Sequence, residues 1–114
     1  MESAKRRVPA VKPVVHNGKR YEPLRRPRDQ GFKQDGGVIA AIDEASGAQL
    51  WAVQLYETVF DANEERDVQE VYVNSLRIDS KNGSLIATDE LKRRWQIRLT
   101  DGHVTQLPAA ESRK

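Results

Sequence analysis

The sequence predicts an all-β protein, a small antiparallel barrel or sandwich of about eight short strands built from two related hairpins, with flexible termini. The first observation is a segment that occurs twice, as GVIAAIDEASGAQLWAVQL at residues 37–55 and as GSLIATDELKRRWQIRL at residues 83–99. The second is that short runs of alternating apolar and polar residues are separated by turn dipeptides such as Asn-Gly and Asp-Gly. The third is that no segment shows the apolar spacing of a long helix.

Length and composition predict the domain organisation. A chain of 114 residues has the size of one ordinary domain, and a charged fraction of 32% leaves a modest core. Residues 1–12 are basic and interrupted by proline, so we expect a disordered basic arm there. Residues 13–107 are expected to form a single all-β domain, and residues 108–114 a disordered tail.

The first hairpin is predicted over residues 13–24. Asn17-Gly18 lies at its centre, and this dipeptide is the one most favoured in two-residue hairpin turns because both residues accept positive φ. Two prolines then limit strand pairing, so residues 24–34 are expected to form a loop or edge lying over the body.

The second hairpin is the first copy of the repeat. A short apolar run at residues 38–43 precedes a turn in which Gly47 is expected to take positive φ. From residue 49 onward the sequence alternates, which places Trp51 in the core and Tyr56 on the opposite face. Residues 57–70 hold six acidic residues and one arginine, so we expect a solvated loop.

The C-terminal half predicts the remaining strands. Two strand-like runs at residues 71–73 and 76–78 change phase between them, as a β-bulge would cause. A turn follows at residues 81–83, and Trp95 is expected to face the core. The last strands are predicted at residues 85–88, 93–99 and 103–107.

The two copies of the repeat share an aspartate and a tryptophan. Asp43 and Asp89 are 46 residues apart, whereas Trp51 and Trp95 are 44 apart. The copies therefore have a period near 45, with a two-residue deletion between the aspartate and the tryptophan of the second copy.

Residues 41–51, AIDEASGAQLW, resemble the repeat of the pyrroloquinoline-quinone-type β-propellers, whose blades carry Ala-x-Asp-x-x-Thr/Ser-Gly-x-x-Leu/Ile-Trp. The resemblance covers residues 37–55 and extends more weakly to residues 83–99, where the Ser-Gly turn is replaced. It implies structural roles for Asp43, Gly47 and Trp51 and no cofactor contact. A closed propeller needs at least four blades of about 45 residues, so this chain is too short to form one.

Few reactive groups are available for chemistry. The absence of Cys excludes disulfides, thiolate catalysis and cysteine-based zinc sites, and the two histidines lie far apart in the sequence. The acidic segment at residues 61–67 fails the calcium-loop pattern, because Arg66 stands where glycine is required. The Asp-Glu pairs at residues 43–44 and 89–90 are expected to accept hydrogen bonds from turn amides and to face water. We therefore predict no catalytic, cofactor or metal site.

Basic residues are distributed unevenly. Residues 1–33 carry a net charge of +7, and residues 92–98 are expected to place three cations on the outer face of one strand. A basic arm and a basic strand could together bind a polyanion, although a solvated or salt-bridged strand face is the simpler alternative. The residues of this candidate site are Lys5, Arg6, Arg7, Lys12, Lys92, Arg94 and Arg98.

The leading functional prediction is a non-catalytic small β module, with an interaction or structural role and an unidentified protein partner. The alternative is a nucleic-acid-binding module that uses the basic arm and the strand at residues 92–98. No stretch approaches the roughly 18 apolar residues of a membrane span, so we expect no membrane partner and a cytoplasmic location. An enzyme with sites on distant loops is the weakest alternative, and the sequence leaves the oligomeric state open.

Overall fold

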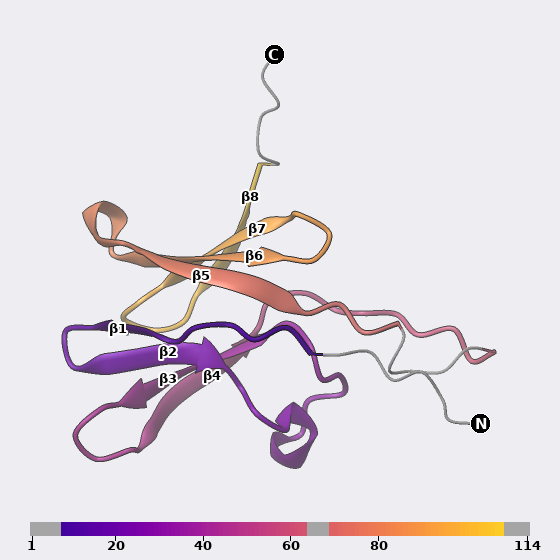
Figure 1. The fold of residues 1–114 in the computed structure, drawn as a ribbon, viewed down its shortest axis with the longest axis horizontal. Helices are drawn as coiled ribbons and strands as arrows, with labels where there is room; N and C mark the ends of the chain where they lie inside the picture. Colours follow the sequence, from indigo (N-terminus) through magenta and orange to yellow (C-terminus); the bar gives the residue numbers. More distant parts are fainter. Residues whose placement is uncertain (1–7, 64–68, 109–114) are drawn as a thin grey trace.

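The computed structural model describes residues 8–63 and 69–108, and it contains eight strands in two four-stranded antiparallel sheets (Figure 1). Sheet A contains β1 (Val14–His16), β2 (Lys19–Pro23), β3 (Val38–Asp43) and β4 (Gln49–Gln54). Sheet B contains β5 (Val73–Asp79), β6 (Ser84–Asp89), β7 (Arg94–Arg98) and β8 (Val104–Leu107). The predicted all-β class is confirmed.

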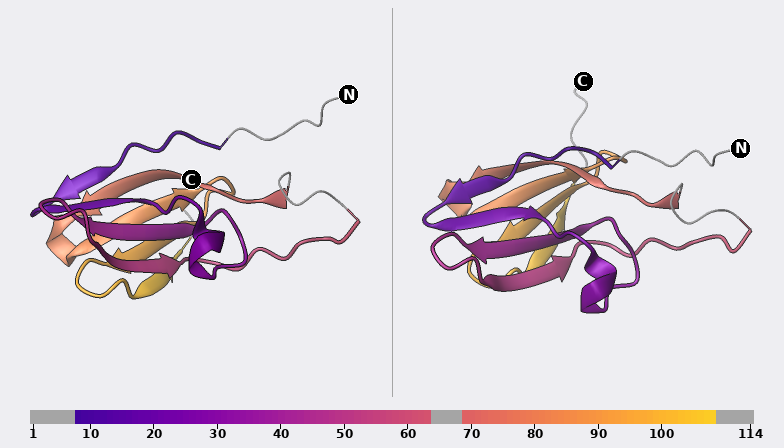
Figure 2. Two further views of the ribbon diagram at one scale, coloured as in Figure 1. Left: turned by 90° about the horizontal axis from the view of Figure 1, so that it is seen from below. Right: turned by 60° about the horizontal axis from the view of Figure 1, so that its bottom comes forward.

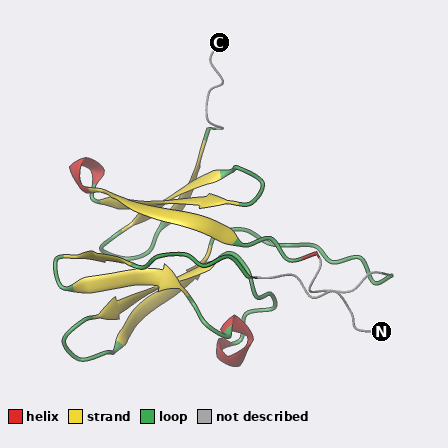
Figure 3. Cartoon of the chain, viewed as in Figure 1, coloured by secondary structure: helices red, strands yellow, loops and turns green. Residues whose placement is uncertain are grey.

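Each strand pairs with the next one along the chain, so both sheets are simple meanders. Two short 3-10 helices, η1 (Pro27–Gln30) and η2 (Ser80–Asn82), lie in the connections and are red in Figure 3. Within the described ranges no helix has the length and apolar character needed to cross a membrane. The predictions for residues 1–7 and 109–114 fall outside the described residues.

The core lies between the two sheets, which stack with β1 beside β5 (Figure 1, Figure 2). Alternating residues of β3 and of β6 supply its centre, because successive side chains of a strand point to opposite faces. The core residues buried almost completely are Tyr21, Ile39, Ala41, Leu85, Ala87 and Ile97.

The other face of β3 is buried as well, with Val38 and Ala40 at 2% and 1% exposure. The connection between β2 and β3 lies against this side, since Gln30 of η1 exchanges two hydrogen bonds with Gln49 of β4 at 3.0 and 2.8 Å. Gln49 pairs with Ile42 of β3 and therefore shares its face. This arrangement agrees with the expected position of residues 24–34 over the body.

Several local predictions are confirmed. Asn17 and Gly18 both have positive φ, 53° and 78°, as a two-residue hairpin turn requires. Gly47 has a φ of 78° in the turn between β3 and β4. The register of β5 shifts between Val73 and Ser75, where the sequence predicted a bulge.

Three side chains differ from their predicted environments. Trp51 is only partly buried at the margin of the core. Tyr56 is buried although alternation placed it on the opposite face, because it lies beyond the end of β4, where strand periodicity no longer applies. Glu70 was predicted in a solvated loop but is 1% exposed, because its carboxylate binds main-chain amides of the connection between β2 and β3.

Candidate functional site

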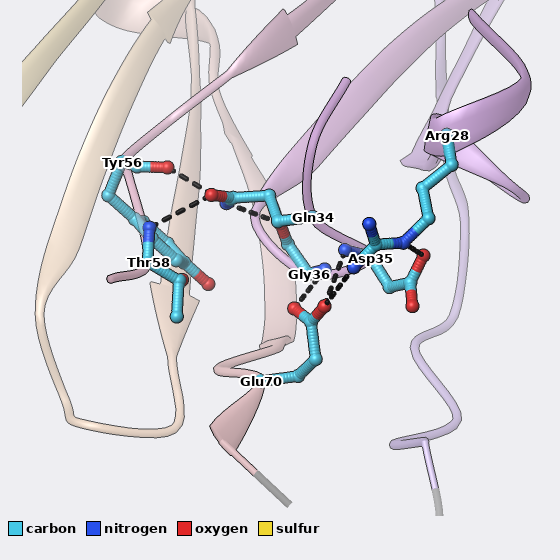
Figure 4. A network of polar contacts seen from close by, with 7 residues as sticks. All are labelled: Arg28, Gln34, Asp35, Gly36, Tyr56, Thr58 and Glu70. Carbon is cyan, nitrogen blue, oxygen red and sulfur yellow. Dashed lines mark hydrogen bonds and ion pairs between the residues drawn. The ribbon is translucent and has the colours of Figure 1, made fainter. Parts of the chain in front are cut away.

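A buried polar network joins the β2–β3 connection to the segment after β4 (Figure 4). The carboxylate of Glu70 accepts hydrogen bonds from the main-chain N–H groups of Asp35 and Gly36, at 2.8 and 2.9 Å. Arg28 donates to the same carboxylate at 3.2 Å and to Asp35 at 3.0 Å. Both oxygens of Glu70 are therefore occupied by structural partners.

Gln34 forms the second half of this network and is 2% exposed. Its amide donates to the carbonyl oxygens of Gly36 and Tyr56, at 2.8 and 2.9 Å, and accepts from the N–H of Thr58 at 2.8 Å (Figure 4). The Tyr56 hydroxyl donates to the Val71 carbonyl at 2.6 Å, and burial raises the pKa of Tyr56. The network therefore stabilises two long loops. Within the described residues the Thr58 hydroxyl is buried there without a hydrogen-bond partner.

Asp89 is a second buried carboxylate and is fully inaccessible to solvent. It accepts from the main-chain N–H groups of Leu91 and Arg93, at 2.9 and 3.0 Å. It also accepts from Nε of Arg93 at 2.8 Å and from the indole Nε1 of Trp95 at 3.1 Å. A carboxylate bound in this way fixes the β6–β7 turn and the orientation of Trp95.

Asp43 occupies the equivalent position in the β3–β4 turn but has fewer partners. Its carboxylate accepts from the hydroxyl and the N–H of Ser46, at 2.7 and 3.1 Å. These hydrogen bonds lower the pKa of Asp43, with a smaller contribution from the charge of Lys19. Both aspartates therefore bind turn groups, as their sequence context predicts. The expectation that both face water is wrong for Asp89, which is buried because the side chains of Arg93 and Trp95 also bind its carboxylate.

The structure describes only part of the predicted polyanion site. Lys5, Arg6 and Arg7 lie outside the described residues, and Lys12 is exposed before β1. The prediction of a strand at residues 92–98 is wrong at its start, because Lys92 has a φ of 68° and belongs to the β6–β7 turn. A positive φ is incompatible with extended strand geometry.

The two arginines of β7 are engaged within the protein. Arg98 forms two hydrogen bonds to Asp101, at 2.9 and 2.8 Å, and this pairing raises the pKa of Arg98 and lowers that of Asp101. Arg94 donates to the Pro108 carbonyl at 2.9 Å. Arg77 of β5 shares the outer face of sheet B with both, through the register of β5, β6 and β7. Sequence analysis missed Arg77, because only strand pairing brings it to this face.

A groove of about 630 Å³ opens at the opposite end of β4 from the polar network. It lies among the β1–β2 turn, the start of β4, η2 and the turn after β7. Figure 1 shows the β1–β2 turn and the β5–β6 connection at the same end of the molecule. Its apolar lining residues are Tyr21, Leu50, Trp51 and Leu99, and its polar lining side chains are His16, Asn17, Lys19, Ser80 and Thr100.

Trp51 is the central feature of this groove. Its ring packs against that of Tyr21, with a centroid distance of 6.0 Å and an interplanar angle of 37°. Within the described ranges the indole N–H of Trp51 has no hydrogen-bond partner, in contrast to that of Trp95. None of the lining residues is acidic. The groove therefore offers an apolar surface, a free N–H donor and a cationic side chain to a ligand.

No residue pattern in the sequence predicted the groove, because its lining comes from four separate connections and strand ends. The closest signal is the His-Asn-Gly-Lys segment of the first turn, which places polar groups at one end of the sheet. The described residues contain no cluster of three or more His, Asp or Glu side chains that could hold a metal ion. No protein-family model matches this chain, and no curated protein matches it.

Proposed function

We propose that this protein is a small non-catalytic binding module that takes its ligand in the groove at Trp51. The observation that carries the proposal is the difference between the two equivalent tryptophans. Trp95 is buried and donates its N–H to Asp89, whereas Trp51 lines an open groove with its N–H unpaired in the described part of the chain. A tryptophan held at a groove with an open donor is suited to recognition, since its ring is apolar and its N–H is polar.

The positions of the acidic groups support a non-catalytic role. Asp43, Glu70 and Asp89 each accept hydrogen bonds from the main chain. A general acid or base must instead reach a proton on its substrate. The groove itself contains no carboxylate among its lining residues. Its chemistry therefore fits binding better than proton transfer.

Amide and indole chemical shifts in ¹⁵N-labelled protein test this proposal. The probes are a thymidine octamer, a linear trisaccharide and a short acidic peptide, which represents the protein partner predicted from the sequence. We expect one probe to shift the signals of groove residues such as Asn17, Ser80 and Thr100, while Gln34 at the other end stays unchanged. If every probe leaves the groove signals unmoved, the proposal is wrong.

A second candidate function is nucleic-acid binding through the outer face of sheet B. The observation that favours it is the shared orientation of Arg77, Arg94 and Arg98 on that face. Removing the charge of Arg94 and Arg98 together tests it, because each lost phosphate contact should weaken binding and reduce its salt dependence. The pairing of Arg98 with Asp101 reduces the charge available there, so we rank this surface below the groove.

We also propose that each sheet corresponds to one blade of a propeller, as the resemblance to the propeller repeat implies. A propeller blade is a four-stranded antiparallel sheet, and both sheets here are meanders of four strands. In this proposal two blade-like units pack face to face. A cytoplasmic location is proposed with this function, and the absence of Cys is compatible with a reducing compartment.

A further inference from the structure

We infer that the groove at Trp51 binds a nucleotide unit of a single-stranded nucleic acid, with a phosphate at Lys19 and the base against the apolar lining. This inference rests on the proposed function and specifies its ligand. It places the nucleic-acid site at the end of the sandwich, at a different location from the basic arm and strand that the sequence indicated.

The charge of the groove favours an anion. Lys19 is its cationic side chain, His16 is the second basic group, and acidic residues are absent from the lining. Asp43 lies close enough for its pKa to respond to Lys19, but its carboxylate already accepts two hydrogen bonds from Ser46. Asp43 nevertheless stays ionised, because those hydrogen bonds lower its pKa, and it offsets part of the charge of Lys19. The feature that favours a phosphate is therefore the Lys19 ammonium itself, which can donate a strong charge-assisted hydrogen bond.

The apolar lining favours a flat ring. Trp51, which is partly exposed, packs on the buried ring of Tyr21 and lines the groove beside Leu50, which is 46% exposed. Aromatic side chains bind the bases of single strands with little sequence preference, because every base has a π face. The volume of about 630 Å³ lies within the range of small-molecule sites and accommodates a base with its sugar and phosphate.

The remaining polar groups match the edge of a base or a sugar. Asn17, Ser80 and Thr100 supply an amide and two hydroxyls, and the indole N–H of Trp51 supplies a donor. The amide nitrogen of Asn17 lies 3.2 Å from Nε2 of His16, so the two side chains are held together at the turn. Bases and sugars present both donors and acceptors, which hydroxyl and amide groups can satisfy.

The test measures fluorescence anisotropy of a fluorescein-labelled thymidine octamer and of a uridine octamer, over a series of salt concentrations. Lys19→Gln should weaken binding roughly ten-fold and reduce the salt slope by about 0.7, the value for one phosphate contact on a single strand. Trp51→Phe keeps an aromatic ring but removes the N–H, and we expect a smaller loss. Lys33→Gln is the matched control, because it removes the same charge from an exposed loop position outside the groove and should leave affinity unchanged.

Three further outcomes show whether the ligand is a free nucleotide or a single strand, and whether the inference or the proposed function has failed. If uridine monophosphate competes with the same affinity as the octamer, the ligand is a free nucleotide. Recognition of a phosphate and a base in the groove would then be supported, with a free nucleotide in place of a single strand. Octamer binding that is insensitive to Lys19→Gln but lost in Arg94→Gln/Arg98→Gln overturns the inference in favour of sheet B. If the trisaccharide or the acidic peptide shifts the groove signals and the octamers do not bind, the inference fails while the proposed function stands.

Discussion

The β3–β4 and β6–β7 hairpins have the same strand pairing but different roles. Ala41 pairs with Trp51 in the first, and Ala87 pairs with Trp95 in the second. The second hairpin buries its aspartate completely against its tryptophan, whereas the first leaves both residues at the margin of the core. Both hairpins therefore contribute strands to the core, but only the tryptophan of the first borders a groove.

Two inserted residues separate the copies, and the structure locates both. The Asp43 N–H donates to the Ala48 carbonyl across a connection of four residues, whereas the Asp89 N–H donates to Arg93 across a connection of three. The second extra residue is Leu50, which has no partner where the register of β3 and β4 shifts. The bulge at Leu50 lies between Trp51 and the turn, so it changes where Asp43 and the turn lie relative to Trp51, while Trp51 keeps the same pairing as Trp95.

The largest expected effect is at the buried aspartate. Asp89→Ala should reduce the free energy of unfolding by about 3–5 kcal/mol, because it leaves Arg93 without its buried partner and the turn amides and indole N–H unpaired. Asp43→Ala should cost much less, since Asp43 lies at the surface with Ser46. Urea unfolding of both variants measures the difference. Equal losses would show that the two turns are energetically equivalent.

Truncating the two tryptophans should also destabilise the second hairpin more than the first. Trp95→Ala should cost about 3–5 kcal/mol, as large aromatic deletions in cores do, and Trp51→Ala should cost clearly less because part of its ring is already exposed. The sequence placed both tryptophans in the core and therefore predicted no difference between them. Acrylamide quenching of the single-tryptophan variants Trp51→Phe and Trp95→Phe provides a second measurement. Stronger quenching of Trp95 than of Trp51 would contradict the comparison.

Each tryptophan packs against a tyrosine, and the pH dependence of those tyrosines sharpens the comparison. Burial raises the pKa of Tyr56, which packs on Trp95 at 5.4 Å, and to a lesser extent that of Tyr21, which packs on Trp51. A raised folded-state pKa contributes stability that is complete below the unfolded value of about 10 and is lost as pH rises through the folded value.

We therefore expect unfolding to become easier above a pH of about 10. Tyr56→Phe should reduce this alkaline destabilisation more than Tyr21→Phe does. Tyrosinate absorbance during an alkaline titration, followed alongside circular dichroism, makes the measurement. Ionisation of Tyr56 at its ordinary value in the folded protein would be incompatible with its observed burial.

The smallest effects on stability are expected at the left-handed residue of each compared turn, Gly47 in the β3–β4 turn and Lys92 in the β6–β7 turn. A Cβ added at Gly47 would meet no other atom within 4 Å, so Gly47→Ala should cost only the backbone strain of about 1 kcal/mol. Lys92 adopts a similar conformation with a side chain, so Lys92→Gly should stabilise the protein by about 0.5 kcal/mol. Thermal unfolding of both variants measures the two opposite shifts. A destabilised Lys92→Gly variant would contradict the left-handed conformation of this turn residue.

Local signals in the sequence predicted most of the fold. The Asn17-Gly18 turn, the conformation of Gly47 and the bulge near Ser75 depend on neighbouring residues, and each is confirmed. The burial of Glu70 was missed, because its partners lie more than thirty residues earlier in the chain. Trp51 was assigned to the core, because alternation gives the face of a strand but not how far the opposite sheet covers it.

The candidate site was the least predictable part of the molecule. Charge alone indicated residues 92–98, and the salt-bridged strand face considered as the alternative describes Arg98, although its partner Asp101 was not identified from the sequence. The groove depends on tertiary structure, since Lys19, Trp51 and Thr100 meet only after both sheets have formed. Periodicity and turn signals therefore predict strands well and predict sites between strands poorly.

The most direct test of the account is the indole N–H signal of each tryptophan in ¹⁵N-labelled protein, recorded with and without the thymidine octamer. We predict that the Trp51 signal exchanges rapidly with solvent and shifts on addition of the octamer. The Trp95 signal should remain protected and unmoved, because its N–H is buried and bound to Asp89. Equal protection of both signals, together with no shift of Trp51 for any probe, would contradict the division between a core tryptophan and a binding tryptophan.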